Sequence, residues 1–481
     1  MLSVERNHED IKRIFDKQKQ FYSPAKPLSF EDRIDLLNRI ETMTRNHMDE
    51  ITRALQKDFG TRSSDWIFTA DFYPVLEHVI KVKKSLKGWM RKEGKSSGLQ
   101  SIFGQRQYIV HEPLGVVGIM SPFNSPFSLA FDPAIEAIAG GNRVMIKMSE
   151  STPAIGDLLE ELVKKYFREE ELAVVNGGLE TSKLFSSLNW DKFFFTGGSE
   201  VGKHILGAAA RNLTPVILEL GGKSPCVVLP DADIEDAARK ITLTRQINGG
   251  QVCISGDYAL VHESNLQAFL EAAVTMSREK LTHIIDNDHF TSIINEREYS
   301  RIVGYIDEAK EAGTKMIQVN PRNEPVPDPV SRKIPLTIFI NPDRHLQVAR
   351  EEIFGPVLTV FTYSKVDEAI AEINSREKAL ALYIFGKNQK DIQKVINHTS
   401  SGGVTVNDLL MHANADEMGF GGVGYSGMGR YKGGKVGYEA FTNPKAVFEQ
   451  GLMGRFTALF VPPYNRDWMR NVLRRQVGVR G

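Results

Sequence analysis

One of the two cysteines in this 481-residue chain lies in a segment that suits a reactive thiol. Cys253 follows Gly249, Gly250 and Gln251 in the stretch "NGGQVCISGDY". A free cysteine is more often a buried apolar residue than a nucleophile, so this segment alone favours a structural role. Its glycines, however, allow the backbone to approach a reacting group closely. Other motifs must decide between the two interpretations.

Two further polar residues have the chemistry that would complement a nucleophilic thiol. Glu219 interrupts the apolar run of "VILELGGKSP", and burial there would raise its pKa towards that of a general base. We favour this functional interpretation over a paired structural glutamate. Asn124 is held between prolines in "SPFNSP", and a rigid amide can donate a hydrogen bond to a developing oxyanion. Taken alone, that motif favours a turn-forming asparagine instead.

The stretch "FFFTGGSEVGK" reads as an apolar strand that passes through a glycine turn into a helix. Such a turn directs backbone N–H groups and the helix dipole at a phosphate. The glycines Gly197, Gly198 and Gly202 do not follow the G-x-G-x-x-G spacing. By itself the motif is equally compatible with a nucleotide-binding loop and with a simple connection.

Two other motifs carry acidic residues beside expected turns. "VMIKMSE" ends an expected strand with Lys147 and Glu150, which could bond the two hydroxyls of a ribose. In isolation the stretch favours a solvated strand end. "EEIFGPV" offers Glu352 and Phe354 beside a Gly-Pro turn.

Composition excludes several other classes of function. Lys and Arg number 60 and so do Asp and Glu, so no global field attracts nucleic acid or an anionic membrane. No H-E-x-x-H or C-x-x-C spacing occurs, and we predict no metal site. Two cysteines fit a reducing compartment, so we expect a cytoplasmic protein. Residues 113–131 are uncharged but interrupted by Pro, Gly, Ser and Asn, and we predict no transmembrane helix.

The hydrophobic pattern predicts an α/β fold of more than one domain. Residues 1–95 read as helices, and residues 96–113 read as a hairpin or extended arm. Apolar strands then alternate with amphipathic helices, which predicts a parallel sheet covered on both faces. The expected strands are 115–120, 143–148, 172–177, 192–197 and 215–220. Ligands of such sheets bind beyond the carboxyl ends of the strands.

The second half repeats this logic less regularly. A helix over 234–247 leads directly into the Cys253 segment, and further helices fit 265–281 and 297–313. Strands fit "ALVHE" and "LTVFTY", residues 318–333 look like a surface loop, and "AVFEQ" suggests a final edge strand. The mildly basic, amphipathic tail "DWMRNVLRRQVGVRG" is expected to be a docking or solvated segment.

Together these motifs resemble the aldehyde dehydrogenase superfamily, over about residues 30 to 450. They occur in its order, and "TSSGGVTVND" and "GGVGYSGMGRYKG" look closest to its short branch, which holds class 3, fatty aldehyde and coniferyl aldehyde dehydrogenases. "KMSE" has methionine where the family often has proline, and "SPFNSP" has phenylalanine where tryptophan is common.

The resemblance implies a Rossmann-like cofactor domain, an α/β catalytic domain and a small β oligomerisation arm. The implied boundaries are a helical part of the cofactor domain at 1–95, the arm at 96–113, the NAD(P)-binding domain at 114–221, the catalytic domain at 222–421, and a glycine-rich return, oligomerisation strand and tail at 422–481. It also implies a homodimer.

The same resemblance implies a role for each candidate residue. Cys253 would attack the aldehyde carbon, Asn124 and the Cys253 N–H would hold the oxyanion, and Glu219 would activate the hydrolytic water. The implied cofactor ligands are Lys147 and Glu150 for the adenosine ribose, Gly197, Gly198, Ser199 and Gly202 at the pyrophosphate, and Glu352 and Phe354 at the nicotinamide ribose and ring. Cys226 falls on an expected buried strand and receives no chemical role.

The expected reaction is NAD(P)-dependent oxidation of an aromatic, coniferyl-type, or medium-chain aldehyde to its acid. Glu150 should repel a 2′-phosphate and favour NAD, although NADP use stays open. The alternatives are a fatty aldehyde dehydrogenase, an enzyme that acylates coenzyme A and a non-catalytic nucleotide-binding protein. Glu219 argues against transfer to coenzyme A, because a water-activating base suits hydrolysis.

Overall fold

The structure is a computed structural model that describes residues 8–95, 105–415, 417–451, 462 and 467–479. The chain divides into two compact units, which are described separately. The larger unit comprises residues 1–89 and 113–442, and the smaller comprises residues 90–112 and 443–481.

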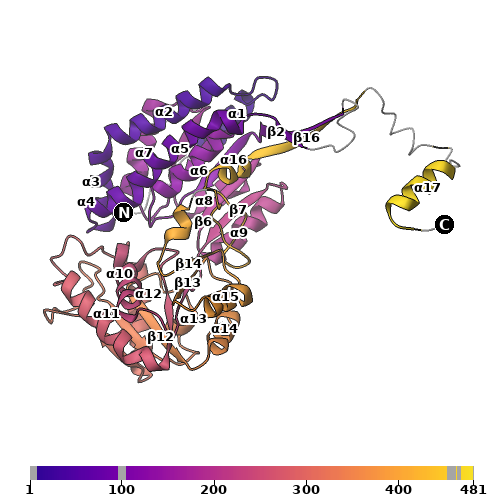
Figure 1. Cartoon of the computed structure of the whole chain (residues 1–481). Coiled ribbons are helices and arrows are strands. Elements are labelled where there is room, and N and C mark those ends of the chain that lie inside the picture. Colours follow the sequence, from indigo (N-terminus) through magenta and orange to yellow (C-terminus); the bar gives the residue numbers. More distant parts are fainter. Residues whose placement is uncertain (1–7, 96–104, 416, 452–461, 463–466, 480–481) are drawn as a thin grey trace. The chain divides into compact units, whose positions relative to one another are not determined.

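The larger unit begins with helices that follow the expected amphipathic pattern (Figure 1). A capping box at Ser29, whose side chain accepts the Asp32 N–H while Asp32 accepts the Ser29 N–H, fixes the start of the second helix. The elements are α1 His8–Phe21, α2 Phe30–Asn46, α3 Met48–Phe59, α4 Ser64–Ile67, the π-helix η1 Phe68–Phe72, and α5 Tyr73–Trp89.

A six-stranded sheet follows, in the order β15-β7-β6-β3-β4-β5. Five strands run parallel, and the short β15 pairs antiparallel with β7, so that Gly427 lies opposite Glu219. The strands are β3 Val116–Met120, β4 Arg143–Lys147, β5 Leu172–Val175, β6 Lys192–Gly197, β7 Val216–Leu220 and β15 Gly427–Met428. The connecting helices are α6 Ser128–Ala139, α7 Pro153–Tyr166, α8 Leu179–Ser187 and α9 Ser199–Ala210.

A second, seven-stranded sheet has the order β10-β11-β12-β9-β8-β13-β14, and only β10 is antiparallel. Its strands are β8 Pro225–Val228, β9 Tyr258–His262, β10 Lys315–Gln318, β11 Thr337–Ile340, β12 Val357–Tyr363, β13 Ala381–Phe385 and β14 Gly403–Val406. The helices of this region are α10 Ile234–Gln246, α11 Leu266–Lys280, α12 Glu296–Glu311, α13 Gln347–Arg350, α14 Val366–Asn374 and α15 Gln389–His398. Helix α16 Lys435–Ala440 packs instead against α6, beside the six-stranded sheet. Short 3-10 turns cover η3 Ile247–Gly250, η4 Glu263–Asn265 and η5 Met411–Asn414.

The smaller unit contains a three-stranded sheet of order β1-β2-β16 and a helix. Its elements are β1 Glu93–Lys95, β2 Arg106–Pro113, β16 Thr442–Glu449 and α17 Asp467–Gln476. Among the described residues, no helix is long and apolar enough to cross a membrane.

The α/β fold and the strand–helix alternation predicted from the sequence are confirmed, with most element ends shifted by no more than three residues. The expected edge strand at 446–450 begins earlier, at Thr442, and Glu93–Lys95 form strand β1 within the residues expected to be helical, because they pair with β2. Tyr108 and Val110 lie on β2, as the expected arm requires, while residues 96–104 lie outside the described residues. The first residue of the expected loop at 318–333 is the last residue of strand β10. The sequence pattern did not predict this strand. The division into cofactor and catalytic domains stays a prediction.

Candidate active site

Helix α10 delivers the chain into a tight loop that carries Cys253. Asn248, Gly249 and Gly250 all have left-handed backbone, with φ of 53°, 62° and 75°. Such a run favours residues without a Cβ. A Cβ on Gly250 would also collide with the backbone carbonyl of Gly355. The glycines therefore serve the close approach of two chain segments, next to a partly buried thiol.

Glu219 lies on β7 with its carboxylate turned towards that thiol. The Cys253 Sγ lies 3.7 Å from Glu219 Oε1, and the S–H donates to this oxygen. The other oxygen accepts hydrogen bonds from the hydroxyls of Tyr431, at 2.9 Å, and Thr196, at 3.2 Å. Only 2 % of Glu219 is exposed, so the three hydroxyl and thiol donors replace the water that a carboxylate normally binds.

Burial controls the protonation of both groups. Desolvation raises the pKa of Glu219, and the hydrogen bonds from Tyr431 and Thr196 oppose that rise. Desolvation also raises the pKa of the Cys253 thiol, and the nearby carboxyl groups of Glu219 and Glu352 raise it further. The thiol is therefore protonated, and it lies beside a carboxylate whose raised pKa allows it to receive the thiol proton.

Asn124 lies in the loop between β3 and α6 and reaches the same place. Its Nδ2 donates to the backbone carbonyl of Gln251 at 3.1 Å, two residues before the thiol. An amide nitrogen carries two hydrogens, so this bond fixes the amide and leaves the second hydrogen for another acceptor. The structure therefore brings Asn124, Glu219 and Cys253 together from three separate parts of the chain.

The residues expected to hold the cofactor's ribose and pyrophosphate lie at the carboxyl ends of β4 and β6. Lys147 Nζ lies 3.0 Å from Glu150 Oε2, and although burial opposes ionisation, Lys147 lowers the pKa of Glu150 overall. Gly198 precedes α9, and a Cβ there would meet no atom of the described chain within 4 Å. Open space beside unpaired N–H groups of a helix start suits a pyrophosphate. Ser199 donates to the Tyr425 carbonyl.

The two remaining glycines of that turn face other atoms. A Cβ on Gly197 would collide with the Phe195 ring, and one on Gly202 would lie 2.8 Å from Cδ2 of Leu220. Gly202 therefore allows α9 to pack closely against β7, and Gly197 leaves room for the Phe195 ring of its own strand. A cation, a carboxylate and a glycine-lined helix start form a donor set that fits a dinucleotide.

Glu352 and Phe354 lie on the loop before β12. Glu352 Oε2 accepts the Gly222 N–H at 3.0 Å, and burial raises the pKa of this carboxyl to about 8. Phe354 has a left-handed φ of 50° and meets the Phe123 ring edge to face, with centroids 5.8 Å apart. Glu352 thus contacts the turn that follows β7, the strand that carries Glu219.

Sequence reasoning missed several residues that support this site. Tyr431 is one, although it stands in the quoted glycine-rich motif. Another group is a buried network in which Asp257 contacts Lys223, lies 3.0 Å from Arg245 and accepts the Ile353 N–H at 3.0 Å. Lys223 and Asp257 are charged residues inside apolar motifs, so the argument applied to Glu219 would have identified them.

Cys226, on β8, is fully buried, and desolvation raises the pKa of its thiol.

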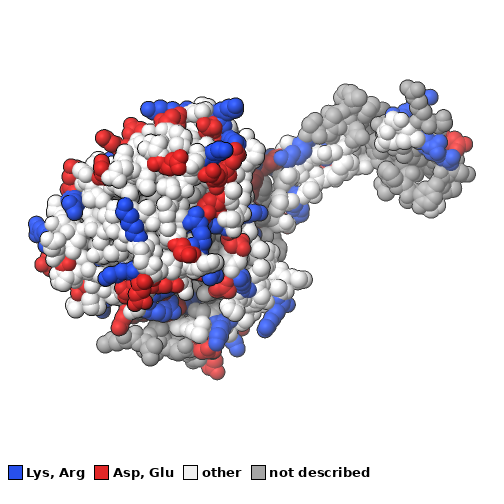
Figure 2. All heavy atoms as spheres, turned by 90° about the horizontal axis from the view of Figure 1, so that it is seen from below, with Lys and Arg blue, Asp and Glu red and all other residues white. Residues whose placement is uncertain are grey.

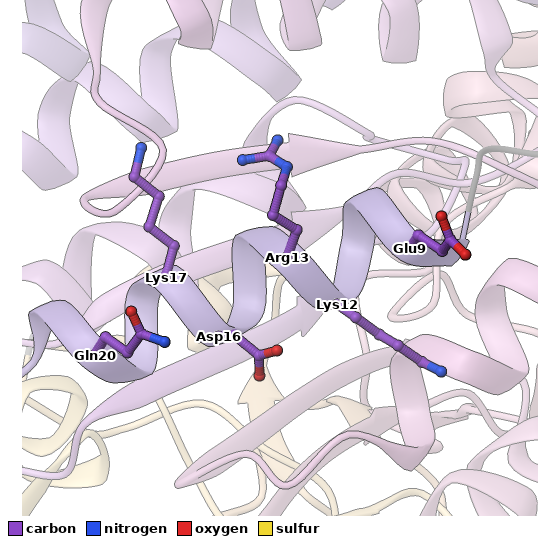
Figure 3. A pocket seen from close by; sticks show the side chains of 6 residues that line it. All are labelled: Glu9, Lys12, Arg13, Asp16, Lys17 and Gln20. Atoms are coloured by element: carbon purple, nitrogen blue, oxygen red, sulfur yellow. The ribbon is translucent and has the colours of Figure 1, made fainter.

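A shallow depression elsewhere, on helix α1, is lined by charged and amide side chains that splay outwards (Figure 3). Two of them, Arg13 and Lys17, pair with Glu169 at 2.8 and 3.3 Å. On the face of the larger unit that Figure 2 shows, basic and acidic side chains intermingle, in line with the balanced composition.

The larger unit combines two helix-covered sheets with a thiol beside a buried carboxylate and with side chains that suit a dinucleotide. Together these features define an enzyme that combines covalent catalysis with cofactor chemistry. The family model described as "Aldehyde dehydrogenase family" matches residues 3–447. A probable coniferyl aldehyde dehydrogenase of Caulobacter vibrioides is 39% identical over 93% of both chains. A coniferyl aldehyde dehydrogenase of a Pseudomonas species is 38% identical over 95% of this chain and 94% of its own.

A solved structure, the substrate-bound state of Staphylococcus aureus AldH, has 33% identity and a TM-score of 0.90, covering 96% of this chain and 99% of its own. The chain therefore belongs to the aldehyde dehydrogenase family, as its motifs indicated. It is an oxidoreductase that acts on aldehydes and uses a nicotinamide cofactor.

Proposed function

We propose that the enzyme oxidises aromatic, coniferyl-type aldehydes to carboxylic acids, with NAD as the preferred cofactor. The observation that carries this proposal is the pairing of Cys253 with the buried Glu219 at 3.7 Å. A nucleophile and a base in direct contact suit formation and hydrolysis of a thioester. The names of the similar coniferyl aldehyde dehydrogenases and the adjacent Phe123 and Phe354 rings support an aromatic substrate.

In the proposed mechanism Cys253 gives its proton to Glu219, and Sγ bonds to the carbonyl carbon of the aldehyde. The carbonyl oxygen, now an oxyanion, accepts hydrogen bonds from Asn124 Nδ2 and from the backbone N–H of Cys253. A nicotinamide cofactor held by the residues named below would supply the acceptor for the hydride that leaves this carbon, so that the C=O bond re-forms and a thioester remains on Cys253. Before hydrolysis, Glu219 releases the thiol proton to solvent. Glu219 then takes a proton from a water molecule, whose oxygen attacks the thioester carbon. The C–S bond breaks, the Cys253 sulfur receives the proton from Glu219, and the acid leaves.

We assign the cofactor to the donor set at the ends of β4 and β6. Lys147 and Glu150 would bond the adenosine ribose, and the α9 start with Gly197, Gly198, Ser199 and Gly202 would receive the pyrophosphate. Glu352 and Phe354 would hold the nicotinamide ribose and ring. The ionised Glu150 supports NAD over NADP, because a 2′-phosphate would bring like charges together.

We further propose that the enzyme is a homodimer joined through the smaller unit. β16 is the terminal strand of the three-stranded sheet, and its described side chains are largely exposed, including Phe448 at 55 %. A terminal strand of this kind can pair with another chain. Analytical ultracentrifugation should give the mass of two chains, and a monomer would refute this part of the proposal.

The test is a product assay with purified protein, NAD or NADP, and a panel of cinnamyl-type, benzyl and straight-chain aldehydes. We expect acid formation without coenzyme A and the highest kcat/KM for cinnamyl-type aldehydes. Cys253→Ala should abolish turnover, while Cys226→Ala, the matched cysteine variant, should retain it. A preference for long straight-chain aldehydes would instead identify a fatty aldehyde dehydrogenase.

A further inference from the structure

A fully buried ion pair lies directly behind the loop that carries Asn124. Arg62 Nη2 is 2.9 Å from Asp71 Oδ2, and neither side chain is exposed at all. The Arg62 guanidinium also stacks on the Phe59 ring, 4.6 Å from its centroid. Neither residue takes part in the mechanism above, so the pair needs another explanation.

Two irregular backbone segments bring Arg62 and Asp71 together. Helix α3 ends at Phe59, and the next residue, Gly60, has a φ of 86°, so the chain turns sharply before Arg62. Asp71 lies in the π-helical turn η1, which separates α4 from α5. A π-helical turn inside a helix is uncommon and is frequent at functional sites.

The pair holds the Asn124 loop at two points. Arg62 Nη2 donates to the backbone carbonyl of Asn124 at 3.2 Å. Asp71 Oδ1 accepts the backbone N–H groups of Phe127, at 3.2 Å, and Ser128, at 3.4 Å. The segment from Asn124 to the start of α6 is therefore attached to one buried unit of opposite charges.

A ring of hydrogen bonds extends this attachment to the Cys253 loop. Asn124 Nδ2 donates to the Gln251 carbonyl, and Gln251 Nε2 donates to the Ser292 carbonyl at 3.1 Å. The Ser292 N–H donates to the carbonyl of Thr61 at 3.0 Å, and Thr61 is bonded covalently to Arg62. The ring thus returns to its starting point and connects Asn124 and Gln251, two residues before Cys253, to the α3–α4 connection.

The pair is poorly suited to a purely stabilising role. Arg62 Nε and Nη1 are buried and have no hydrogen-bond partner within the described structure. Burying charges and leaving donors unpaired costs free energy, and apolar residues of similar volume often replace such pairs without loss of stability. Because the Arg62–Asp71 pair costs free energy and contacts the loop that carries Asn124, it is better explained by the position that it imposes on this loop.

We propose that Arg62 and Asp71 are positioning residues that hold the Asn124 amide where the oxyanion forms. This inference rests on the proposed role of Asn124 and assigns a new role to two residues that touch no reacting atom. Oxyanion donors must lie within a few tenths of an ångström of their productive position to be effective. Weakening the pair should therefore lower the rate of the chemical steps and leave cofactor binding unchanged.

The experiment compares Arg62→Lys and Asp71→Asn with Asn124→Ala and with Arg39→Lys as the matched control. Arg39 Nη1 also bridges a carboxylate, Glu171 at 2.8 Å, and a backbone carbonyl, that of Tyr166 at 3.0 Å. For each folded variant, kcat/KM for the aldehyde, KM for NAD and the melting temperature are measured. Asp71→Asn keeps the shape of the side chain, so it provides the test if Arg62→Lys does not fold.

We expect Asn124→Ala to lower kcat/KM about a hundredfold or more, and Arg62→Lys and Asp71→Asn to lower it about tenfold to a hundredfold. Arg39→Lys should stay within about twofold of the wild type. Adding Arg62→Lys to Asn124→Ala should cause no further loss, because Arg62 acts through Asn124. KM for NAD should not change.

Two results would overturn the inference: wild-type kcat/KM in Arg62→Lys and Asp71→Asn, or equal losses from Arg62→Lys with and without Asn124. If Asn124→Ala itself has wild-type kcat/KM, the proposed oxyanion role fails, and the inference fails with it. If Asn124→Ala is impaired and the pair variants are not, only the inference fails.

Discussion

The Sγ of Cys253 and the Oε1 of Glu219 lie 3.7 Å apart, although Glu219 lies on β7 of the six-stranded sheet and Cys253 lies 34 positions later, on the loop before β9 of the seven-stranded sheet. Both groups are shielded from water, which raises the pKa of each. At neutral pH the thiol therefore keeps its proton until a base accepts it, and Glu219 is the contacting carboxylate. The next two predictions concern Glu219 and the Tyr431 hydroxyl that bonds to it.

Glu219→Gln should lower the steady-state turnover number about a hundredfold to ten-thousandfold, because it removes the base for hydrolysis. Because Glu219 also accepts the thiol proton, acylation of Cys253 should slow as well, which intact-protein mass spectrometry can follow after aldehyde and cofactor are added. Glu160→Gln, which also replaces a buried glutamate of the larger unit, is the control. Turnover of Glu219→Gln close to that of the control would contradict the assignment.

Tyr431→Phe should move the acidic limb of the kcat profile to higher pH by about one unit. The Tyr431 hydroxyl stabilises the ionised carboxylate of Glu219, so its loss raises the pKa of Glu219, and more base is protonated at a given pH. Tyr363→Phe is a matched control, since its buried hydroxyl donates only to the Val228 carbonyl. An unshifted profile in Tyr431→Phe would show that Tyr431 does not tune the base.

Glu150→Gln should raise the ratio of kcat/KM for NADP to that for NAD about tenfold, because it removes a charge that repels the 2′-phosphate. Lys147, at 3.0 Å from Glu150, remains to attract the added phosphate. Glu161→Gln, an exposed residue on α7, makes the same change of net charge. Equal ratios in both variants would place the 2′-position away from Glu150.

The approach of Asn124, Glu219 and Cys253 could be predicted because each stands in a motif at the end of an expected element. Parallel strands end at one edge of their sheet, so Asn124, after β3, and Glu219, near the end of β7, are brought to the same edge without any knowledge of side-chain contacts. The glycines before Cys253 likewise indicated a close backbone approach, and Gly250 against Gly355 is that approach.

The partners of these residues could not be predicted in the same way. Tyr431 is 212 positions from Glu219, and Arg62 is 62 positions from Asn124, so no periodicity connects them. A hydrophobic pattern gives the face of an element but not which polar atom on another element it meets. The π-helical turn that carries Asp71 also has no composition of its own, because it depends on the packing of α4 and α5.

A second buried network lies beneath the glycine-rich segment. His78, on α5, bonds Asp132 Oδ1 at 3.0 Å and Glu136 Oε1 at 2.6 Å, and Lys432 Nζ lies 2.8 Å from Asp132 Oδ2. Burial lowers the pKa of His78, but the carboxylates of Glu136 and Asp132 outweigh it and raise the pKa to about 9. The imidazole is therefore charged at neutral pH and connects α5 with α6.

His78→Gln should destabilise the protein in a pH-dependent way. Because folding raises the pKa of His78 from 6.5 to about 9, its contribution is complete below pH 6.5 and disappears as the pH rises through 9. The difference in unfolding free energy between wild type and variant should thus be larger near about pH 6 than near about pH 10, by on the order of 3 kcal/mol. Urea unfolding at both pH values measures it. His262→Gln, whose ring contacts Ser264 and the Ser364 carbonyl, is the control. A difference that is equal at the two pH values would mean that folding does not raise the pKa of His78.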